Sequence, residues 1–185
     1  MTAGLAIEES YGDWAPPFDP KPIITRLLDS VPGEYLSGID TVILASSGAL
    51  NRKRRRQTQR LHGRKFANST ARGLYHPRWH GQGAYVELFV DNILRSVPSP
   101  RLSRLPVFGD LEFGDVLYHE IGHHIHAVKH PEHEDRELVA ERWRKRLIRR
   151  HMRHRFWYLQ PLRLLLWPLS LLMNAIVYRH RRSVK

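Results

Sequence analysis

The sequence contains no cysteine among its 185 residues. Without cysteine there is no disulfide framework and no thiolate metal site, so any bound metal must use histidine and carboxylate ligands. The N-terminus also lacks the basic start and the apolar run of a secretory signal peptide. These absences favour a cytoplasmic protein, and the length suits one globular domain with an appendage.

Acidic residues are missing from the C-terminal quarter of the chain. Residues 142–185 contain 13 lysines and arginines, whereas residues 1–141 contain 17 basic and 18 acidic residues. The formal net charge of +12 therefore comes from the C-terminal segment. A nucleic-acid-binding domain usually spreads its basic face over the fold, so nucleic acid is a disfavoured partner. The basic run Arg52–Arg60 is a local exception that we interpret as a solvated loop, since it lacks the aromatics of a single-strand-binding surface.

The apolar stretch near the C-terminus is short for a membrane-spanning helix. Its uncharged core, Leu164–Tyr178, has 15 residues, whereas a span needs about 20. Nearby tryptophan and tyrosine, with basic flanks, are typical of attachment to an anionic membrane surface. We therefore expect residues 142–185 to attach to the inner face of the membrane. A helix packed on the protein's own core or on a second copy, and a true span, are the alternatives, and the oligomeric state is left open.

Hydrophobic periodicity predicts an α+β chain. Residues 1–22 are rich in proline and are expected to be irregular, with a short helix following at Ile23–Ser30. β-Branched residues at Ile39–Ser46 predict a buried strand, and the β-forming stretches Ala71–His80 and Gly83–Leu94 predict a hairpin.

After a Pro/Ser loop the period changes from about two to 3.6, which predicts a helix from Asp110 to the residue before Pro131. One stripe of this helix is apolar, and four histidines occupy the opposite side. The apolar residues are Leu117, Ile121, Ile125 and Val128, and the histidines are His119, His123, His126 and His130.

The sequence His119-Glu120-Ile121-Gly122-His123 lies within this histidine face. Histidines at i and i+4 point the same way and can both reach one Zn²⁺ at about 2.0–2.1 Å. A glutamate beside the first histidine leans over the open metal position, where it can act as a general base. We therefore predict one Zn²⁺ bound by His119 and His123, with Glu120 as the catalytic base.

A third protein ligand is needed to complete such a site. The metzincin pattern fails, because His126 and Lys129 occupy the positions where it requires glycine and histidine. A helix returning after Pro131 would instead bring a glutamate level with His123. Among Glu132, Glu134, Glu137 and Glu141, we favour Glu137, because Ala140 one turn later allows close helix packing. Glu141 is the alternative ligand, or a hydrogen-bond partner of a ligand histidine, or an ion-pair partner of Lys145.

The motif His119-Glu120-x-x-His123 followed by Glu137-x-x-Ala140-Glu141 resembles the gluzincins, and the compact order of elements is similar to the small minigluzincins. The sequence departs from the family in a short gap of 13 residues between His123 and Glu137 and in Glu141 at a position usually held by Asp or Asn. The resemblance implies a zincin-like α+β fold, a small antiparallel or mixed sheet packed on the two helices.

The resemblance also implies a metallopeptidase that hydrolyses peptide bonds of peptide or protein substrates. A substrate would lie extended along an edge strand, for which Ala84–Val90 is the candidate. The oxyanion partner is left open among Tyr75, His76, His80 and Tyr85. A non-catalytic zinc-binding sensor or interaction module with a basic tail is the alternative function, and Glu120 argues against it.

We accordingly expect three regions: an N-terminal segment at 1–35, a metallopeptidase domain at 36–155 and a basic, apolar C-terminal segment at 156–185.

Overall fold

The computed structural model describes residues 5–51, 53–54, 58–61, 64–97, 99, 101–133 and 135–159. The expectations for the apolar tail, and for much of the basic run Arg52–Arg60, lie outside these residues. Contacts divide the chain into a unit that ends at His151 and a second unit that begins at Met152. Strands and helices of the expected segment 1–35 belong to the same unit as those of the expected domain up to His151.

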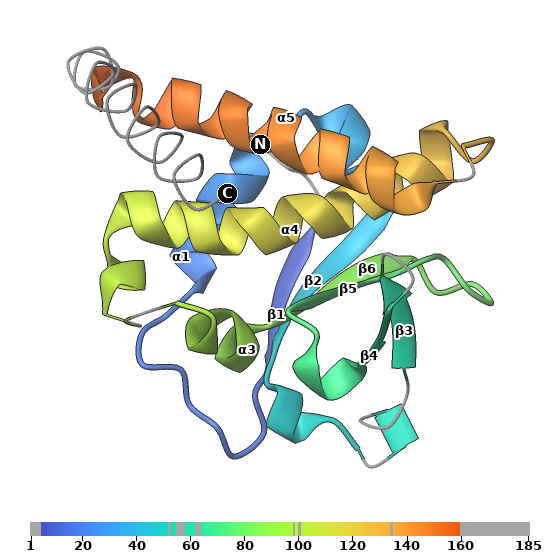
Figure 1. Ribbon diagram of the computed structural model, residues 1–185, viewed down its shortest axis with the longest axis horizontal. Coiled ribbons are helices and arrows are strands. Elements are labelled where there is room, and N and C mark those ends of the chain that lie inside the picture. Colours follow the sequence, from blue (N-terminus) through green and yellow to red (C-terminus); the bar gives the residue numbers. More distant parts are fainter. Residues whose placement is uncertain are drawn as a thin grey trace, which may run out of the picture. The chain divides into compact units, whose positions relative to one another are not determined.

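A mixed four-stranded sheet forms the centre of the first unit, which confirms the α+β class (Figure 1). Its order is β1-β2-β6-β5, where β1 is Ala6–Ser10, β2 is Ile39–Ala45, β6 is Ala84–Phe89 and β5 is Gly73–His76. The first three strands are parallel, and β5 is antiparallel to β6. Separate from this sheet, β3 (Thr58–Leu61) and β4 (Arg64–Ala67) form an antiparallel pair.

The strand predictions were right for β2, β5 and β6, but they missed β1 and named the wrong strand as an edge of the sheet. The buried strand at Ile39–Ser46 and the hairpin between the next two stretches are confirmed as β2 and β5–β6. Residues 1–22 are not wholly irregular, because β1 pairs with β2; most of its side chains are exposed, so it carries no period-two signal. The predicted edge strand at Ala84–Val90 is an inner strand, and β5 covers its outer side.

Four helices of six or more residues are described: α1 (Lys21–Asp29), α3 (Val90–Arg95), α4 (Pro106–Lys129) and α5 (Arg136–Arg155). Short 3-10 turns occur at Gly33–Tyr35, Ser47–Ala49, Asn68–Thr70, Leu102–Arg104 and Trp157–Leu159. The helix α4 begins a turn earlier than predicted, because Pro106 at its first position has the fixed φ that suits a helix start. Its predicted end before Pro131 is confirmed.

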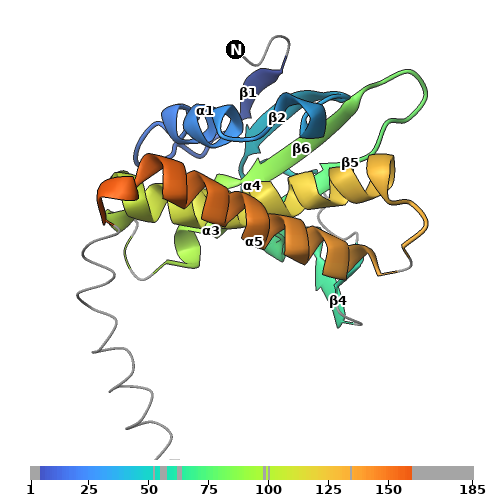
Figure 2. The ribbon, with the colours of Figure 1, turned by 90° about the horizontal axis from the view of Figure 1, so that it is seen from above.

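The helix α4 packs on β5 and β6 and is the main support of the core (Figures 1 and 2). Leu117, Ile121 and Ile125 are almost wholly buried, as the periodicity predicted, and α1 packs beside them. Val128 is 58% exposed, so the predicted apolar stripe ends before it. The helix α5 lies on the outer side of α4, so α4 is placed between the sheet and α5.

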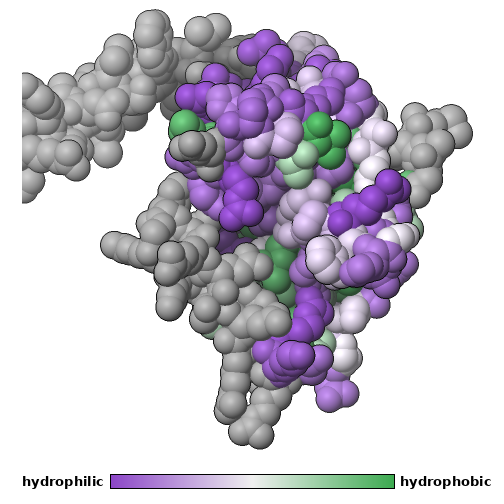
Figure 3. All heavy atoms as spheres, turned by 90° about the vertical axis from the view of Figure 1, so that its right-hand side faces the viewer, coloured by the Kyte–Doolittle hydropathy of each residue, from purple (hydrophilic) through white to green (hydrophobic). Residues whose placement is uncertain are grey.

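Among the described residues, no helix combines the length and the apolarity needed to cross a membrane. The described surface on the side of the molecule shown in Figure 3 is mainly hydrophilic.

Candidate metal centre

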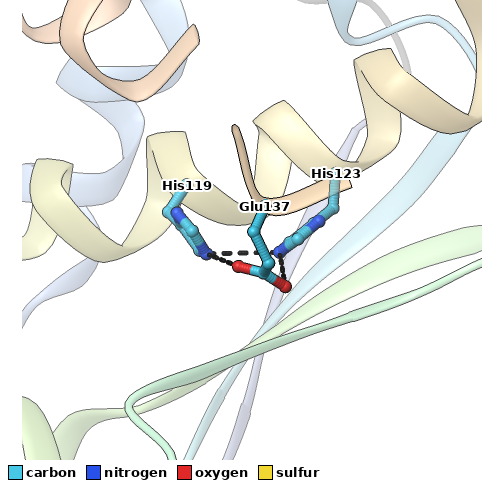
Figure 4. Close-up of side chains that lie close together, drawn as sticks. All are labelled: His119, His123 and Glu137. Carbon is cyan, nitrogen blue, oxygen red and sulfur yellow. Dashed lines mark hydrogen bonds and ion pairs between the residues drawn. The ribbon is translucent and has the colours of Figure 1, made fainter. Parts of the chain in front are cut away.

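Three side chains from two helices converge at one point (Figure 4). His119 and His123 come from α4, and their Nε2 atoms lie 3.2 Å apart. Glu137, in the first turn of α5, places one carboxylate oxygen 3.5 Å from Nε2 of His119 and the other 3.6 Å from Nε2 of His123. One potential ligand atom from each residue lies within 4.8 Å of the other two, so the three form a compact donor set.

The spacing of these atoms suits a tetrahedral zinc site. Bonds of about 2.0–2.1 Å from a central ion place neighbouring ligand atoms roughly 3.3–3.4 Å apart. The Nε2–Nε2 distance of 3.2 Å is close to this value, and the carboxylate of Glu137 places one oxygen 3.5 Å from Nε2 of His119 and the other 3.6 Å from Nε2 of His123. Two imidazole nitrogens and one carboxylate are also donors that Zn²⁺ prefers. His119, His123 and Glu137 therefore fit the ion that the sequence predicts.

A close approach of the two helices brings Glu137 to the histidines. A Cβ atom added at Gly122 would lie 2.7 Å from both Cα and the carbonyl oxygen of Ala140. Ala140 is wholly buried at this contact. The backbone of α5 can lie this close to α4 only because Gly122 has no side chain and Ala140 has a small one. The close helix packing expected at Ala140 is present.

Replacing Gly122 by alanine is expected to push α5 away from α4 and to withdraw Glu137 from the histidines. Overpacking of this kind costs about 1–3 kcal/mol of stability, and we expect roughly a tenfold or greater loss of zinc affinity. Thermal unfolding and zinc titration measure the two effects. Gly33→Ala is the matched control, since nothing lies within 4 Å of an added Cβ there. Equal zinc affinity in the two variants would contradict this account of the helix contact.

The pKa values of the two histidines shift in opposite directions. Burial, the largest influence on His119, lowers its pKa, but the hydrogen bond to Glu137 and the neighbouring carboxylate charges outweigh it, so the pKa is raised overall. Burial, followed by the charge of His119, lowers the pKa of His123 to about 4. Without metal, a proton shared by the pair is therefore held more readily by His119 than by His123. A cation binding at this point would have to displace that proton, so zinc affinity should fall as the pH falls.

Glu120 lies beside the triad of His119, His123 and Glu137, on the face of α4 toward β5. Only 7% of it is exposed, and burial raises the pKa of its carboxyl group to about 7, against the opposing effects of the His119 charge and of a hydrogen bond from the Tyr75 backbone. A Cβ atom at Gly73 would lie 2.9 Å from Oε1 of Glu120. Strand β5 can therefore approach Glu120 closely only because Gly73 carries no side chain.

Glu141 lies one turn after Glu137 and is held by cations. Its two oxygens accept hydrogen bonds from Nε and Nη2 of Arg144 at 2.7 and 2.5 Å, and Nζ of Lys145 lies 3.1 Å from one of them. Arg144 also pairs with Asp115 on α4. The ion pair with Lys145, one of the alternatives for Glu141, is therefore present. The charge of Glu141 contributes to the raised pKa of His119, and its role as a partner of a ligand histidine stays a prediction.

Of the four candidates for an oxyanion partner, Tyr75 contacts α4, the helix that carries the two histidines. Its hydroxyl is 3.1 Å from Nδ1 of His124, whose Nε2 is 3.0 Å from the carbonyl oxygen of Ser37. A carbonyl only accepts, so Nε2 of His124 carries the proton, and Nδ1 must accept the hydrogen bond of the Tyr75 hydroxyl. Burial lowers the pKa of His124, which favours this neutral form. The hydroxyl of Tyr75 thus links β5 to α4 through this hydrogen bond, and it does not donate a hydrogen bond to the triad.

The other three candidates lie elsewhere in the hairpin. His76 contacts Glu87 at 3.2 Å and stacks on Tyr85, while His80 adopts a positive φ of 44° in the loop. Sequence reasoning did not single out Arg72, Asp115 or Arg144, which form a chain of ion pairs beside the triad. Sequence reasoning could not pair these residues, because the partners are far apart in the chain: Arg72 and Asp115 are separated by 43 residues.

A cleft of about 970 Å³ opens over the triad, between β5, α4 and the first turns of α5. Its lining includes His119, Glu120, His123, Glu137, Tyr75 and the three residues of the ion-pair chain. Of the oxyanion candidates in the described chain, Tyr75 alone lines it. The chain matches no protein-family model, no curated protein and no solved structure.

Proposed function

We propose that this protein is a zinc-dependent metallopeptidase of the gluzincin type, with a zincin-like fold. The observation that carries the proposal is the convergence of His119, His123 and Glu137 beside a buried Glu120 in an open cleft. Two neighbouring histidines and a glutamate from a following helix are the donor set of such sites. A module that only held a metal would have no use for a proton-accepting carboxylate beside it.

The residues of the chain supply distinct parts of a hydrolytic reaction. His119, His123 and Glu137 would hold Zn²⁺, which when bound provides a Lewis acid that polarises the scissile carbonyl and acidifies water. Glu120, buried beside the metal ligands, can accept a proton from the attacking water and pass it to the leaving amine. The low exposure of Glu120 keeps bulk solvent from competing for that proton.

Strand β5 is suited to hold the substrate. It pairs with β6 on one side, and no other described strand pairs with it. Gly73, Leu74 and Tyr75 line the cleft, and the backbone of Tyr75 forms a hydrogen bond with Glu120. An extended peptide could pair with this edge and lie across the metal position. The hydrogen bond between Tyr75 and His124 would fix the distance between β5 and α4.

Removing the metal tests the proposal directly. Dialysis of the full-length protein against a chelator is expected to abolish cleavage of a diverse peptide library, and about one equivalent of Zn²⁺ should restore it. Mg²⁺ should not restore activity, because it prefers oxygen ligands in octahedral geometry. Full activity in protein shown to be free of metal would refute the proposal. Zinc binding without cleavage of any peptide would favour the non-catalytic zinc-binding module.

A further inference from the structure

A row of cations runs along one side of α5, away from the cleft. Five of these residues lie before the end of the first unit and are partly or largely exposed: Arg142, Lys145, Arg146, Arg149 and Arg150. At about 100° per residue they fall within an arc of roughly 140° around the helix axis, over about 12 Å of its length. We call these five residues the α5 cation stripe. The upper part of Figure 3, at the height of α5 in Figure 1, is mainly hydrophilic.

The opposite side of the same helix packs against the rest of the fold. Ala140, Leu147 and His151 are buried there, and Trp143 packs against the core beside Tyr35. The helix is therefore fixed in its rotation about its own axis. The α5 cation stripe is held outward by the packing of the other side, and it is not a set of residues that could turn inward.

The charges of the stripe are poorly compensated within the described chain. Lys145 pairs with Glu141, but no described acidic side chain pairs with any of the four arginines. Arg146 lies over the ring of Trp143, and Nε of Arg150 donates to the carbonyl oxygen of Ser30. Cations three and four residues apart on a helix repel one another. A solvated face usually interleaves glutamate at such positions, whereas no acidic residue follows Glu141 in the sequence.

We propose that the α5 cation stripe is a docking surface for anionic lipid headgroups. Phosphate headgroups would neutralise the adjacent guanidinium groups, and each cation near such a surface adds to the binding. The end of the helix, in the second unit, is followed by Trp157 and Tyr158, which are 70% and 56% exposed. Such aromatic residues are favoured where lipid meets water. In the sequence, the uncharged run Leu164–Tyr178 follows these aromatic residues. The two features together favour a membrane over a nucleic acid as the partner.

Docking on this side leaves the cleft accessible. The cleft-lining residues of α5 are Arg136, Glu137, Glu141 and Arg144, and they lie more than about 100° around the helix from the centre of the stripe. A membrane that contacts the stripe would therefore not cover the triad. The docking is independent of the metal, so it should persist in a variant that has lost zinc.

Sedimentation of the full-length protein with vesicles tests the proposal. The vesicles are phosphatidylcholine alone, or phosphatidylcholine mixed with phosphatidylglycerol. Wild-type protein should bind the mixed vesicles more tightly, and Arg142→Glu/Arg149→Glu should lower that partitioning by at least about tenfold. Arg78→Glu/Arg101→Glu is the matched control, with the same change of charge at exposed positions outside α5. It should change partitioning by less than about threefold, since charges away from the contact are screened.

Circular dichroism and zinc content verify that each variant is folded. Should the charge reversal disturb α5, Arg142→Gln/Arg149→Gln gives the same test, with about half the effect on a logarithmic scale. Equal partitioning of the stripe variant and the control overturns the proposal, as does equal binding of wild-type protein to vesicles without phosphatidylglycerol. It is also overturned if a DNA duplex strips the protein from vesicles and its binding shows the same dependence on Arg142 and Arg149.

Discussion

Replacing Glu120 by glutamine is expected to leave the zinc content unchanged and to lower peptidase activity by roughly 10²–10⁴-fold. Glutamine has nearly the same shape as glutamate, so the contact of residue 120 with Gly73 can persist. An amide cannot accept the proton of the attacking water, and the loss should therefore appear in kcat more than in KM. Steady-state kinetics on a cleaved peptide, together with elemental analysis, measures both expectations.

The fold of this variant should not be weakened. Burial raises the pKa of the Glu120 carboxyl group to about 7, above its ordinary value, so in the metal-free protein the charged form is disfavoured by folding. The loss of stability from burying the charged carboxylate is absent below the ordinary pKa of a glutamate and reaches its full size above pH 7. The uncharged glutamine does not have this loss. Metal-free Glu120→Gln should thus be at least as stable as wild type at pH 8. Activity that survives the substitution would assign the proton transfer to another group.

Replacing His123 by alanine is expected to remove zinc from the protein. The imidazole Nε2 of His123 lies within 3.2–3.6 Å of atoms from both other members of the triad, so its loss leaves two donors. Losing only an outer partner of a metal ligand typically costs 10–100-fold in affinity, and losing a ligand should cost more. Elemental analysis after dialysis should find about one zinc per wild-type chain and almost none in the variant.

His130→Ala is the matched control for this experiment. His130 follows the end of α4, and its imidazole contacts Glu132, outside the triad. Thermal unfolding adds a second readout, because an ion that binds only the folded state raises its stability. Zinc should raise the melting temperature of wild type and of His130→Ala and leave that of His123→Ala unchanged. Equal zinc in all three proteins would contradict the assignment of His123 as a ligand.

Local patterns in the sequence determined the elements that carry the site. Spacings of four residues identified the buried side of α4 at Leu117, Ile121 and Ile125. The i,i+4 relation of His119 and His123 follows from helix geometry alone. Pro131 marked the end of that helix, and Ala140 marked Glu137 as the carboxylate able to return to it. These predictions succeeded because each rests on residues within a few turns of one another.

Only the tertiary structure decided which groups meet across the fold. Asp110 was predicted to begin a helix, yet its buried carboxylate accepts from Arg26 at 2.7 Å and from His151 at 2.8 Å. The position of β5 outside β6, and the fastening of Tyr75 to His124, likewise depend on partners far away in the chain. A hydrophobic period specifies which side of an element is buried, but not which element covers it. That choice belongs to the packing of the whole unit, where contacts between distant segments compete for the same buried positions.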